Sequence, residues 1–356
     1  MSRHWIGVLL LLIVIGAAIP AGHLALFAIS ARMPGSQELQ AVEVHKGQGP
    51  NEITKSLLSL GVLASGRDFI LLGKITRDWK KIKAGEYAVS AAMTPLELFQ
   101  SITSGVSIAH PITVREGENM YEVAADLEAK GLASEDQILE LMRKTKFIAA
   151  LGIEGSPTTL EGYLFPDTYY FNKTLSAEDL IREMTHHFKE MWKPEYTKRA
   201  AALGMSQFQI VTLASMIEKE TGATQERPLI SSVFYNRLRK HMKLQSDPTT
   251  IYGMWDRYTG KIHRSDLMKK DDYNTYQIPA LPIGPISNPG IESIHAALFP
   301  ATSDFLFFVS HNNGTTEFTR SLVDHNAAVR KFQLDPKARN GKSWRDLKKA
   351  TQEGGK

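Results

Sequence analysis

The chain has 356 residues, no cysteine and a formal net charge of +4 at pH 7. This length predicts two or three domains with residues enough for at least one sizeable core, and the lack of cysteine excludes a disulfide framework, thiol catalysis and thiolate metal sites. The charge excess is small and spread along the chain, so a nucleic-acid partner is not expected, although an anionic envelope would suit it.

The N-terminal segment, residues 5–29, contains no Asp, Glu, Lys or Arg. At about 1.5 Å per residue, it is long enough to cross a bilayer core of about 30 Å. Arg3 precedes it, which places residues 1–4 in the cytoplasm and the rest of the chain outside. A cleaved signal peptide is the alternative, but the apolar residues continue through Phe27. We therefore expect an uncleaved, single-pass transmembrane helix, followed by a polar linker over residues 30–39.

Two stretches of similar pattern follow, one beginning at Val44 and the other at Val114. Each contains an apolar strand, a glycine turn, a helix with apolar residues at i and i+4, a glycine stop, and a second helix that begins after Ala-Ser. We interpret them as one βαα unit used twice, the second copy covering residues 110–150. The first copy closes with a strand over residues 82–89, so residues 40–109 form a βααβ module that resembles a LysM-type glycan-binding module. Packing alone also explains every apolar position of this module, so glycan binding stays open.

Residues 161–170, after the second copy, alternate aromatic and acidic residues around a proline. Such a segment either lines a binding site or forms a buried edge strand with tyrosine tips at the surface, and the pattern does not choose between them. The amphipathic helix predicted next, residues 180–192, carries His186 and His187. Because adjacent helical residues point to different sides, this pair cannot jointly hold a metal ion.

The most informative helix begins at Ser206, where Gln209 completes a capping box, and ends in Glu218-Lys219-Glu220. At about 100° per residue, the two glutamates lie on opposite flanks of its apolar stripe. A carboxylate held beside apolar surface tends to keep a proton and could serve as a general acid. Helix geometry does not choose between Glu218 and Glu220, and a solvated helix end is the simpler alternative for both.

Polar motifs become denser after this helix. Residues 281–290 contain three prolines and two glycines, so they form a stiff, shaped loop of the kind that builds sites rather than cores. Around this loop we expect a helix over residues 229–239, a proline-bent stretch over residues 244–253, a helix over residues 291–298, a buried strand over residues 305–310 and a polar tail over residues 336–356.

The sequence lacks several common catalytic motifs. It contains no phosphate-binding Gly-Lys-Ser/Thr loop, no His-Glu-x-x-His zinc helix, no Gly-x-Ser-x-Gly elbow and no dinucleotide fingerprint. Neither a cofactor nor a metal ion is therefore expected. The polar residues that remain are carboxylates with Asn, Gln, Tyr and Thr, which are the residue types of carbohydrate chemistry.

Taken together, these motifs resemble the endolytic murein transglycosylase family (MltG or YceG-like). The resemblance runs from the membrane segment to about Lys331. In one departure, Thr316 stands where many members carry a histidine. The matching stretches are Glu161 to Tyr169, Ala214 to Glu220, Glu226 to Pro228, Val233 to Leu238, Leu244 to Thr249, Tyr273 to Tyr276 and Leu281 to Gly290.

The resemblance implies a bitopic inner-membrane enzyme whose periplasmic part cuts nascent peptidoglycan strands internally at the MurNAc–GlcNAc bond. Carried over from the family, the catalytic residue is Glu218. It would donate a proton to the glycosidic oxygen and then take one from the MurNAc 6-hydroxyl, which closes as a 1,6-anhydro ring without a second carboxylate. The candidates for substrate binding are Glu161, Tyr163, Asp167, Glu220, Asn236, Gln245, Asp247, Tyr252 and Asn274.

The expected fold is α+β, with a transmembrane helix, the LysM-like module and a larger mixed α+β catalytic domain over residues 110–335. The expected partners are peptidoglycan strands, the membrane and wall-synthesis enzymes (peptidoglycan synthases). Two alternatives stay open. The chain could be a hydrolytic muramidase that pairs Glu218 with Asp167 or Asp247, or a non-catalytic scaffold that binds glycan and recruits synthases.

Overall fold

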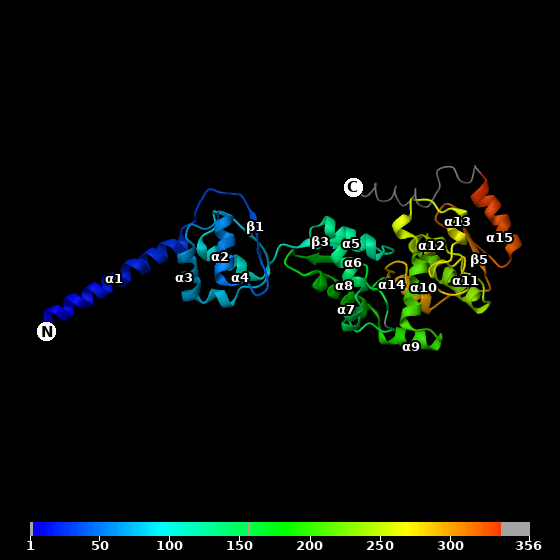
Figure 1. Ribbon diagram of the computed structural model, residues 1–356, viewed down its shortest axis with the longest axis horizontal. Helices are drawn as coiled ribbons and strands as arrows, with labels where there is room; N and C mark the ends of the chain where they lie inside the picture. Colours follow the sequence, from blue (N-terminus) through cyan, green and yellow to red (C-terminus); the bar gives the residue numbers. More distant parts are fainter. Residues whose placement is uncertain (1–2, 156, 336–356) are drawn as a thin grey trace. The chain divides into compact units, whose positions relative to one another are not determined.

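A computed structural model describes residues 3–155 and 157–335 of the chain. The chain divides into two compact units (Figure 1). Unit 1 comprises the residues up to Pro111 together with Tyr170–Ser176, and unit 2 comprises Ile112–Tyr169 and the residues from Ala177 onward. The polar tail predicted for residues 336–356 lies outside the described residues.

Unit 1 contains the predicted order of strand, two helices and strand. Its two strands pair antiparallel, with Gln40 opposite Val89 and Val44 opposite Gly85. The second strand is shorter than predicted, because residues 82–84 form no ladder. The elements are α1 (Arg3–Ile29), β1 (Gln40–Val44), α2 (Pro50–Ser59), α3 (Gly66–Thr76), η1 (Asp78–Lys80), β2 (Gly85–Val89) and α4 (Pro95–Ser104).

The core of unit 1 lies between these helices and the two strands. Phe69 of α3 stacks on Phe99 of α4 with ring centroids 4.1 Å apart, and Trp79 meets both rings edge-on. Side chains that cap the helices fix where the helices begin. Ser65 accepts from the Asp68 amide, and Thr94 completes a capping box with Glu97.

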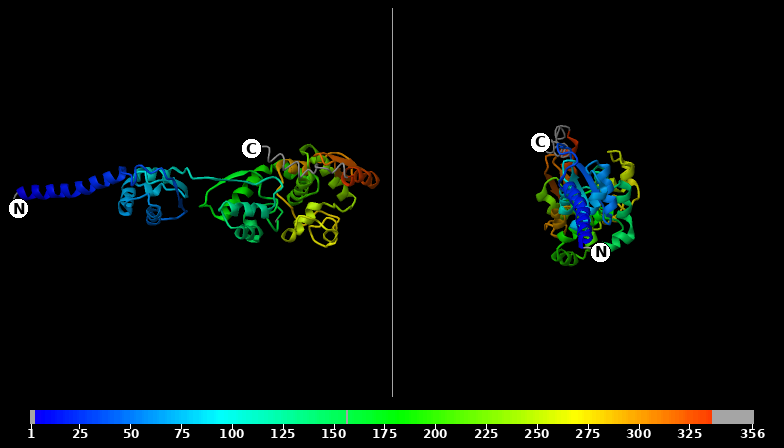
Figure 2. Two further views of the ribbon diagram at one scale, coloured as in Figure 1. Left: turned by 90° about the horizontal axis from the view of Figure 1, so that it is seen from above. Right: turned by 90° about the vertical axis from the view of Figure 1, so that its left-hand side faces the viewer.

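Helix α1 is continuous through Pro20 (Figure 2). Among the described residues, no single helix is long and apolar enough to qualify as a candidate membrane span, and Ala18–Ile29 is a shorter apolar helix. The pair formed by α9 and α10 of unit 2 reaches the required length and composition only together, with a bend of 91°.

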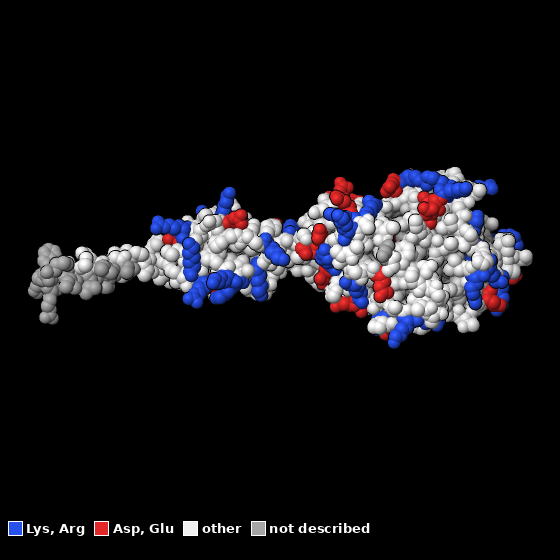
Figure 3. All heavy atoms as spheres, turned by 60° about the horizontal axis from the view of Figure 1, so that its bottom comes forward, with Lys and Arg blue, Asp and Glu red and all other residues white. Residues whose placement is uncertain are grey.

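Charge is distributed differently on the two units. On the face shown in Figure 3, Lys and Arg predominate over unit 1, whereas both signs are mixed over unit 2. An exposed basic series in unit 1 follows α3 and η1 and consists of Lys74, Arg77, Lys80, Lys81 and Lys83.

Unit 2 is mixed α+β, mainly helical, with small sheets of two strands. Strand β3 pairs with β4, and β5 pairs antiparallel with β6 from Phe307 opposite Thr319 to Ser310 opposite Thr316. Its elements are β3 (His110–Thr113), α5 (Met120–Ala129), α6 (Glu135–Arg143), α7 (Thr145–Ala150), β4 (Thr168–Phe171), α8 (Ala177–Met191), α9 (Pro194–Ala202), α10 (Gln207–Glu220), η2 (Thr224–Glu226), α11 (Arg227–Arg239), α12 (Asp247–Gly253), η3 (Trp255–Arg257), α13 (Arg264–Met268), α14 (Ile291–Leu298), β5 (Phe307–Ser310), β6 (Thr316–Thr319), α15 (Leu322–Val329) and η4 (Arg330–Leu334).

Helix α10 is the centre of unit 2. The Ser206–Gln209 capping box starts it, and every residue from Ile210 to Ile217 is buried. It contacts α9, α11, α12 and α14, which surround it in Figure 1. A helix buried on all sides has its position fixed, so its last turn holds the residues that follow Ile217 in defined places.

The proline-rich loop over residues 281–290 is bound to this helix and to the loop before α5. The Ser215 hydroxyl accepts from the Ile286 amide at 3.0 Å, and the Ser215 carbonyl accepts from the Ser287 hydroxyl at 3.2 Å. Asn288 donates from its side chain to the Glu118 carbonyl at 3.0 Å. These contacts bring the start of α14 beside the end of α10.

Candidate active site

Glu218, in the last turn of α10, is held by two donors. Its Oε1 accepts a hydrogen bond from Arg227 Nη2 at 3.0 Å, and its Oε2 accepts one from the Gly290 amide at 3.1 Å. Only 7% of the side chain is exposed. Each carboxylate oxygen thus has a hydrogen-bond donor, one of them charged. Glu218 is therefore desolvated, but by polar partners rather than by apolar neighbours alone.

The Arg227 guanidinium bridges two carboxylates. Besides Glu218, its Nη2 reaches Glu116 Oε2 at 3.4 Å. The fit around this group is tight at Gly290, where an added Cβ would lie 1.9 Å from Glu116 Oε1. An added side chain at position 290 would therefore require the Glu116 side chain, which is 47% exposed, to move away.

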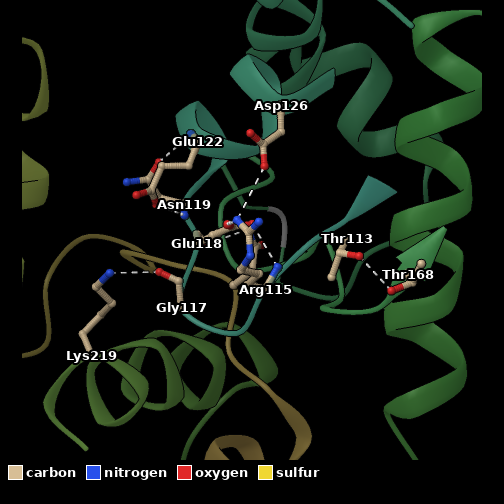
Figure 4. Close-up of polar contacts among 10 residues, drawn as sticks. Thr113, Arg115, Gly117, Glu118, Asn119, Glu122, Asp126, Thr168 and Lys219 are labelled. Atoms are coloured by element: carbon tan, nitrogen blue, oxygen red, sulfur yellow. Dashed lines mark hydrogen bonds and ion pairs between the residues drawn. The ribbon is translucent and has the colours of Figure 1, made fainter. Parts of the chain in front are cut away.

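The loop before α5 lies beside the end of α10, where Gly117 approaches Lys219 (Figure 4) and the Glu218 side chain. Lys219 Nζ donates to the Gly117 carbonyl at 3.0 Å, and Gly117 has a φ of 82°, which favours glycine. In the same loop Asn119 caps α5, accepting from the Glu122 amide while Glu122 accepts from the Asn119 amide at 2.8 Å. The loop is therefore fixed at both of its ends.

A cavity of about 650 Å³ opens beside the end of α10, on the Glu220 side. Glu218 is absent from the described residues that line it. The lining combines carboxyl groups, an amide, hydroxyls and aromatic rings, and includes Asn119, Glu122, Glu220, Asp247, Tyr252, Trp255, Tyr258 and Thr316. Polar groups beside aromatic faces are what a sugar ring requires, since it offers hydroxyls at its rim and C–H bonds on its faces.

Glu220 differs from Glu218 in its surroundings. Its Oε1 accepts from the Ser246 hydroxyl at 2.6 Å. Burial raises the pKa of Glu220 to about 7, the Ser246 hydrogen bond opposes this, and the nearby Asp247 raises the pKa further while Arg237 lowers it. Glu220 is therefore largely protonated below pH 7.

The segment that carries Ser246 is held in a strained form. Gln245 has a φ of 51°, in the left-handed region that a side chain disfavours. From one side Thr275 accepts from the Ser246 amide at 2.9 Å, and from the other Arg237 donates to the Leu244 carbonyl at 2.7 Å. Asp247, the next residue, accepts from the Tyr276 hydroxyl at 2.7 Å. The left-handed backbone at Gln245 thus places Ser246 and Asp247 beside Glu220.

Glu161 lies behind this region and is completely buried. Its Oε2 accepts from the Met120 amide at 3.0 Å. Its Oε1 has no hydrogen bond of normal geometry to any described residue, although Tyr252 lies close enough to affect it. Burial raises the pKa of Glu161 to about 7, against the lowering effect of the Met120 amide and the Tyr252 hydroxyl.

Two of the predicted binding residues fix loops. Asn236 Nδ2 donates to the carbonyls of Ser303 and Phe305 at 3.0 and 2.8 Å. Asn274 Nδ2 donates to three carbonyls of the segment before it, the nearest being that of Lys269 at 2.7 Å. Both side chains are buried, so they support the site from within the protein.

The remaining predicted residues lie in different places. Tyr163 is buried in the core, edge-on to Phe188 with ring centroids 4.9 Å apart. Asp167 is exposed and pairs with His187 Nε2 at 2.9 Å. Neither is among the described residues that line the cavity, whereas Glu220, Asp247 and Tyr252 all line it.

Sequence reasoning missed several lining residues. Trp255 stacks on Tyr121 with ring centroids 5.6 Å apart, and Thr316 donates its amide to Glu226 Oε1 at 3.0 Å. Thr316 was noticeable only as a departure from a family pattern. Trp255 stands in a short turn with no periodicity to mark it, so only the tertiary fold shows its role.

The pKa of Glu161 predicts a pH-dependent stability. Between pH 4.5 and about 7 the folded state binds more protons than the unfolded state, so the free energy of unfolding falls as pH rises through this window and levels off above it. The free energy of unfolding should fall by about 1.4 kcal/mol per pH unit, or by about 3 kcal/mol over the whole window. Glu161→Gln should remove this pH dependence. Urea unfolding at several pH values measures it. The exposed Glu195→Gln serves as the control, and equal slopes for the two variants would contradict the prediction.

Loss of Arg227 should destabilise unit 2. Arg227→Ala leaves Glu218 buried with one donor, which should lower the free energy of unfolding by about 3 kcal/mol, and Arg227→Lys should cost less because the charge remains. The matched control is Arg320→Ala, since the Arg320–Asp304 pair is 66% and 70% exposed and should contribute far less to stability because both charges stay solvated. Chemical denaturation compares them; equal costs would show that the buried pair has no special role.

Comparison with known proteins places this chain in a family. Residues 42–331 match the model of the YceG-like family. A protein of Bacillus subtilis strain 168 named endolytic murein transglycosylase is 33% identical over 308 residues, which cover 82% of this chain and 84% of the relative. A Streptococcus pneumoniae D39 protein of the same name is 26% identical over 328 residues, covering 83% of this chain and 58% of that longer relative.

A solved structure gives the same result. The crystal structure at 2.6 Å of a yceG-like protein from Listeria monocytogenes matches with a TM-score of 0.56 and 32% identity, covering 82% of this chain and 100% of that one. The resemblance found in the motifs is confirmed, and the chain belongs to the YceG-like family.

Proposed function

We propose that this chain is an endolytic murein transglycosylase, which cleaves the MurNAc–GlcNAc β-1,4 bond within peptidoglycan strands and leaves 1,6-anhydroMurNAc ends. The observation that carries the proposal is the family match over residues 42–331, which includes all of α10 and the loops around its end. Two relatives that cover more than four-fifths of the chain bear this name.

Glu218 is the proposed catalytic residue. As an acid it gives its proton to the glycosidic oxygen while the bond from that oxygen to the MurNAc C1 breaks. As a carboxylate it then takes the proton of the 6-hydroxyl, whose oxygen bonds to C1, so the residue ends as it began. The Arg227 and Gly290 donors suit the carboxylate stage.

The cavity beside Glu220 is the proposed place for sugar units next to the cleaved bond. Tyr252 and Trp255 give it an aromatic wall, and Glu122 and Asp247 supply acceptors for hydroxyl groups. These residues come from α5, α12 and η3, which pack against α10 or the loop before α5. Binding across such rigid elements holds a flexible strand in one register.

Unit 1 is proposed to anchor the enzyme and to contact the cell wall. The uncharged residues 5–29, preceded by Arg3, support a single-pass span of the inner membrane with unit 2 in the periplasm. The βααβ order over β1 to β2 supports a LysM-like module that binds glycan. The exposed basic series on α3 and η1 suits an anionic envelope. Peptidoglycan synthases are proposed as partners on the resemblance alone.

One observation favours a second function, hydrolysis by a muramidase. Asp247 lines the cavity beside Glu220, where a second carboxylate could activate water. Asp167, the other acid considered for this role, is exposed and ion-paired with His187. Hydrolysis would therefore depend on Asp247.

Glu218→Gln tests the proposal. It should leave the protein folded, because Arg227 retains Glu116 as a partner, and it should reduce cleavage of glycan strands by at least about 100-fold, since Gln can neither give nor take the proton. Mass spectrometry of digested strands measures both the rate and the chemistry of the ends, with Glu195→Gln as the control. Undiminished activity would remove Glu218 from the mechanism, and reducing ends in place of anhydro ends would favour the muramidase.

A further inference from the structure

Two carboxyl groups from different helices face the same cavity. Glu220 closes α10 and Asp247 opens α12, and both line the space of about 650 Å³. Each already has one oxygen occupied, since Ser246 donates to Glu220 Oε1 and Tyr276 donates to Asp247 Oδ1. Glu220 Oε2 and Asp247 Oδ2 are therefore the oxygens left for a ligand.

The two groups are in different protonation environments. Burial and the neighbouring Asp247 raise the pKa of Glu220 to about 7, so below that pH its free oxygen carries a hydrogen and donates. Asp247 is exposed and accepts from a phenol, so it offers an acceptor. A buried carboxyl group with a raised pKa beside a second carboxyl group in one cavity is a recurring feature of functional sites.

Other charges around Glu220 do not cancel this difference. Arg237 of α11 lies behind it and lowers its pKa, but that guanidinium donates to the carbonyls of Leu244 and Leu306. Lys219 is bound to the Gly117 carbonyl. Glu122 of α5, on the opposite wall, adds a further negative charge.

A donor from one helix and an acceptor from another can complement a secondary amide, whose carbonyl oxygen and N–H point in opposite directions because the amide is trans. The same cavity has apolar lining from Ile251, Trp255 and Ile286, which suits a methyl group next to that amide. Resting on the proposed function, we propose that Glu220 and Asp247 recognise the 2-acetamido group of an aminosugar in the strand, with the Glu220 carboxylic acid donating to its carbonyl oxygen and Asp247 accepting from its N–H.

The support of this pair is consistent with recognition. The φ of 51° at Gln245 costs free energy, and the Thr275 and Arg237 contacts maintain it. A strained segment is retained where it presents side chains that a relaxed one would not. Here it presents Ser246 to Glu220 and Asp247 to the cavity, so the pair is ordered before a ligand arrives.

Ionisation of Glu220 should abolish its donor. With a pKa of about 7 the protonated fraction falls about tenfold between pH 6 and pH 8, and apparent affinity falls in proportion to the competent fraction. Gln at position 220 keeps an N–H donor and cannot ionise, whereas Ala removes the donor. The two substitutions therefore separate a donor role from a role of the charge.

The experiment measures binding of short glycan strands by calorimetry with the full chain, in a Glu218→Gln background that prevents cleavage. The strands are used fully N-acetylated, chemically de-N-acetylated, and re-acetylated as a control. Acetylated strands should bind the parent about tenfold more weakly at pH 8 than at pH 6. When Glu220→Gln is added to this parent, acetylated strands should bind at both pH 6 and pH 8 as tightly as the parent binds them at pH 6. Added Glu220→Ala should weaken acetylated strands at pH 6 but leave de-acetylated strands unchanged.

Three results would overturn the inference. They are a pH dependence that persists with Gln at position 220, a loss of pH 6 affinity in that variant, and an equal loss from Glu220→Ala on acetylated and de-acetylated strands, which would indicate a structural role. Circular dichroism and thermal unfolding confirm that each variant is folded. If the parent binds no strand at pH 6, the proposed function itself fails; if it binds independently of Glu220, only this inference fails.

Discussion

Helix α10 is buried along most of its length and ends in two carboxylates. The surrounding segments must therefore supply hydrogen-bond partners for both. The body of α10, from Ile210 to Ile217, is buried, and the two glutamates after it are only partly exposed, so hydrogen-bond partners must replace much of their solvent. The fold satisfies Glu218 and Glu220 in different ways. The start of α14 and Arg227 supply donors to the first, and a strained segment before α12 supplies a hydroxyl to the second.

The different surroundings of Glu218 and Glu220 suit them to different proposed roles. Glu218 rests between two donors and suits the stage at which a carboxylate takes up a proton. Glu220 rests against a hydroxyl and an acid, and burial lets it hold a proton to neutral pH. The proposed cleavage needs one group that both gives and takes a proton, while the proposed recognition needs one that holds its proton. The two glutamates have different hydrogen-bond partners although only Lys219 separates them in sequence.

Local sequence patterns predicted helices and strands well where the pattern is itself the physical cause of the element, as a capping box is for the start of a helix. The capping boxes at Ser206 and Thr94 mark helix starts, and the β1–α2–α3–β2 order followed from apolar spacing and glycine stops. They could not separate Glu218 from Glu220, because the partners that distinguish them, Arg227 and Ser246, come from other segments. The same limit applies to Asn236 and Asn274. Polar residues in a dense motif resemble ligands of a substrate, but these two satisfy buried carbonyls of their own loops.

The central claim is that this member of the YceG-like family breaks the glycan bond with the sugar's own 6-hydroxyl and not with water. The most direct measurement is digestion of glycan strands in water labelled with a heavy oxygen isotope, followed by mass spectrometry of the new ends. Lytic cleavage by Glu218 predicts anhydro ends that carry no label, since the ring oxygen comes from the sugar. Incorporation of one labelled oxygen at each new MurNAc reducing end would show that water is the nucleophile and would contradict the account.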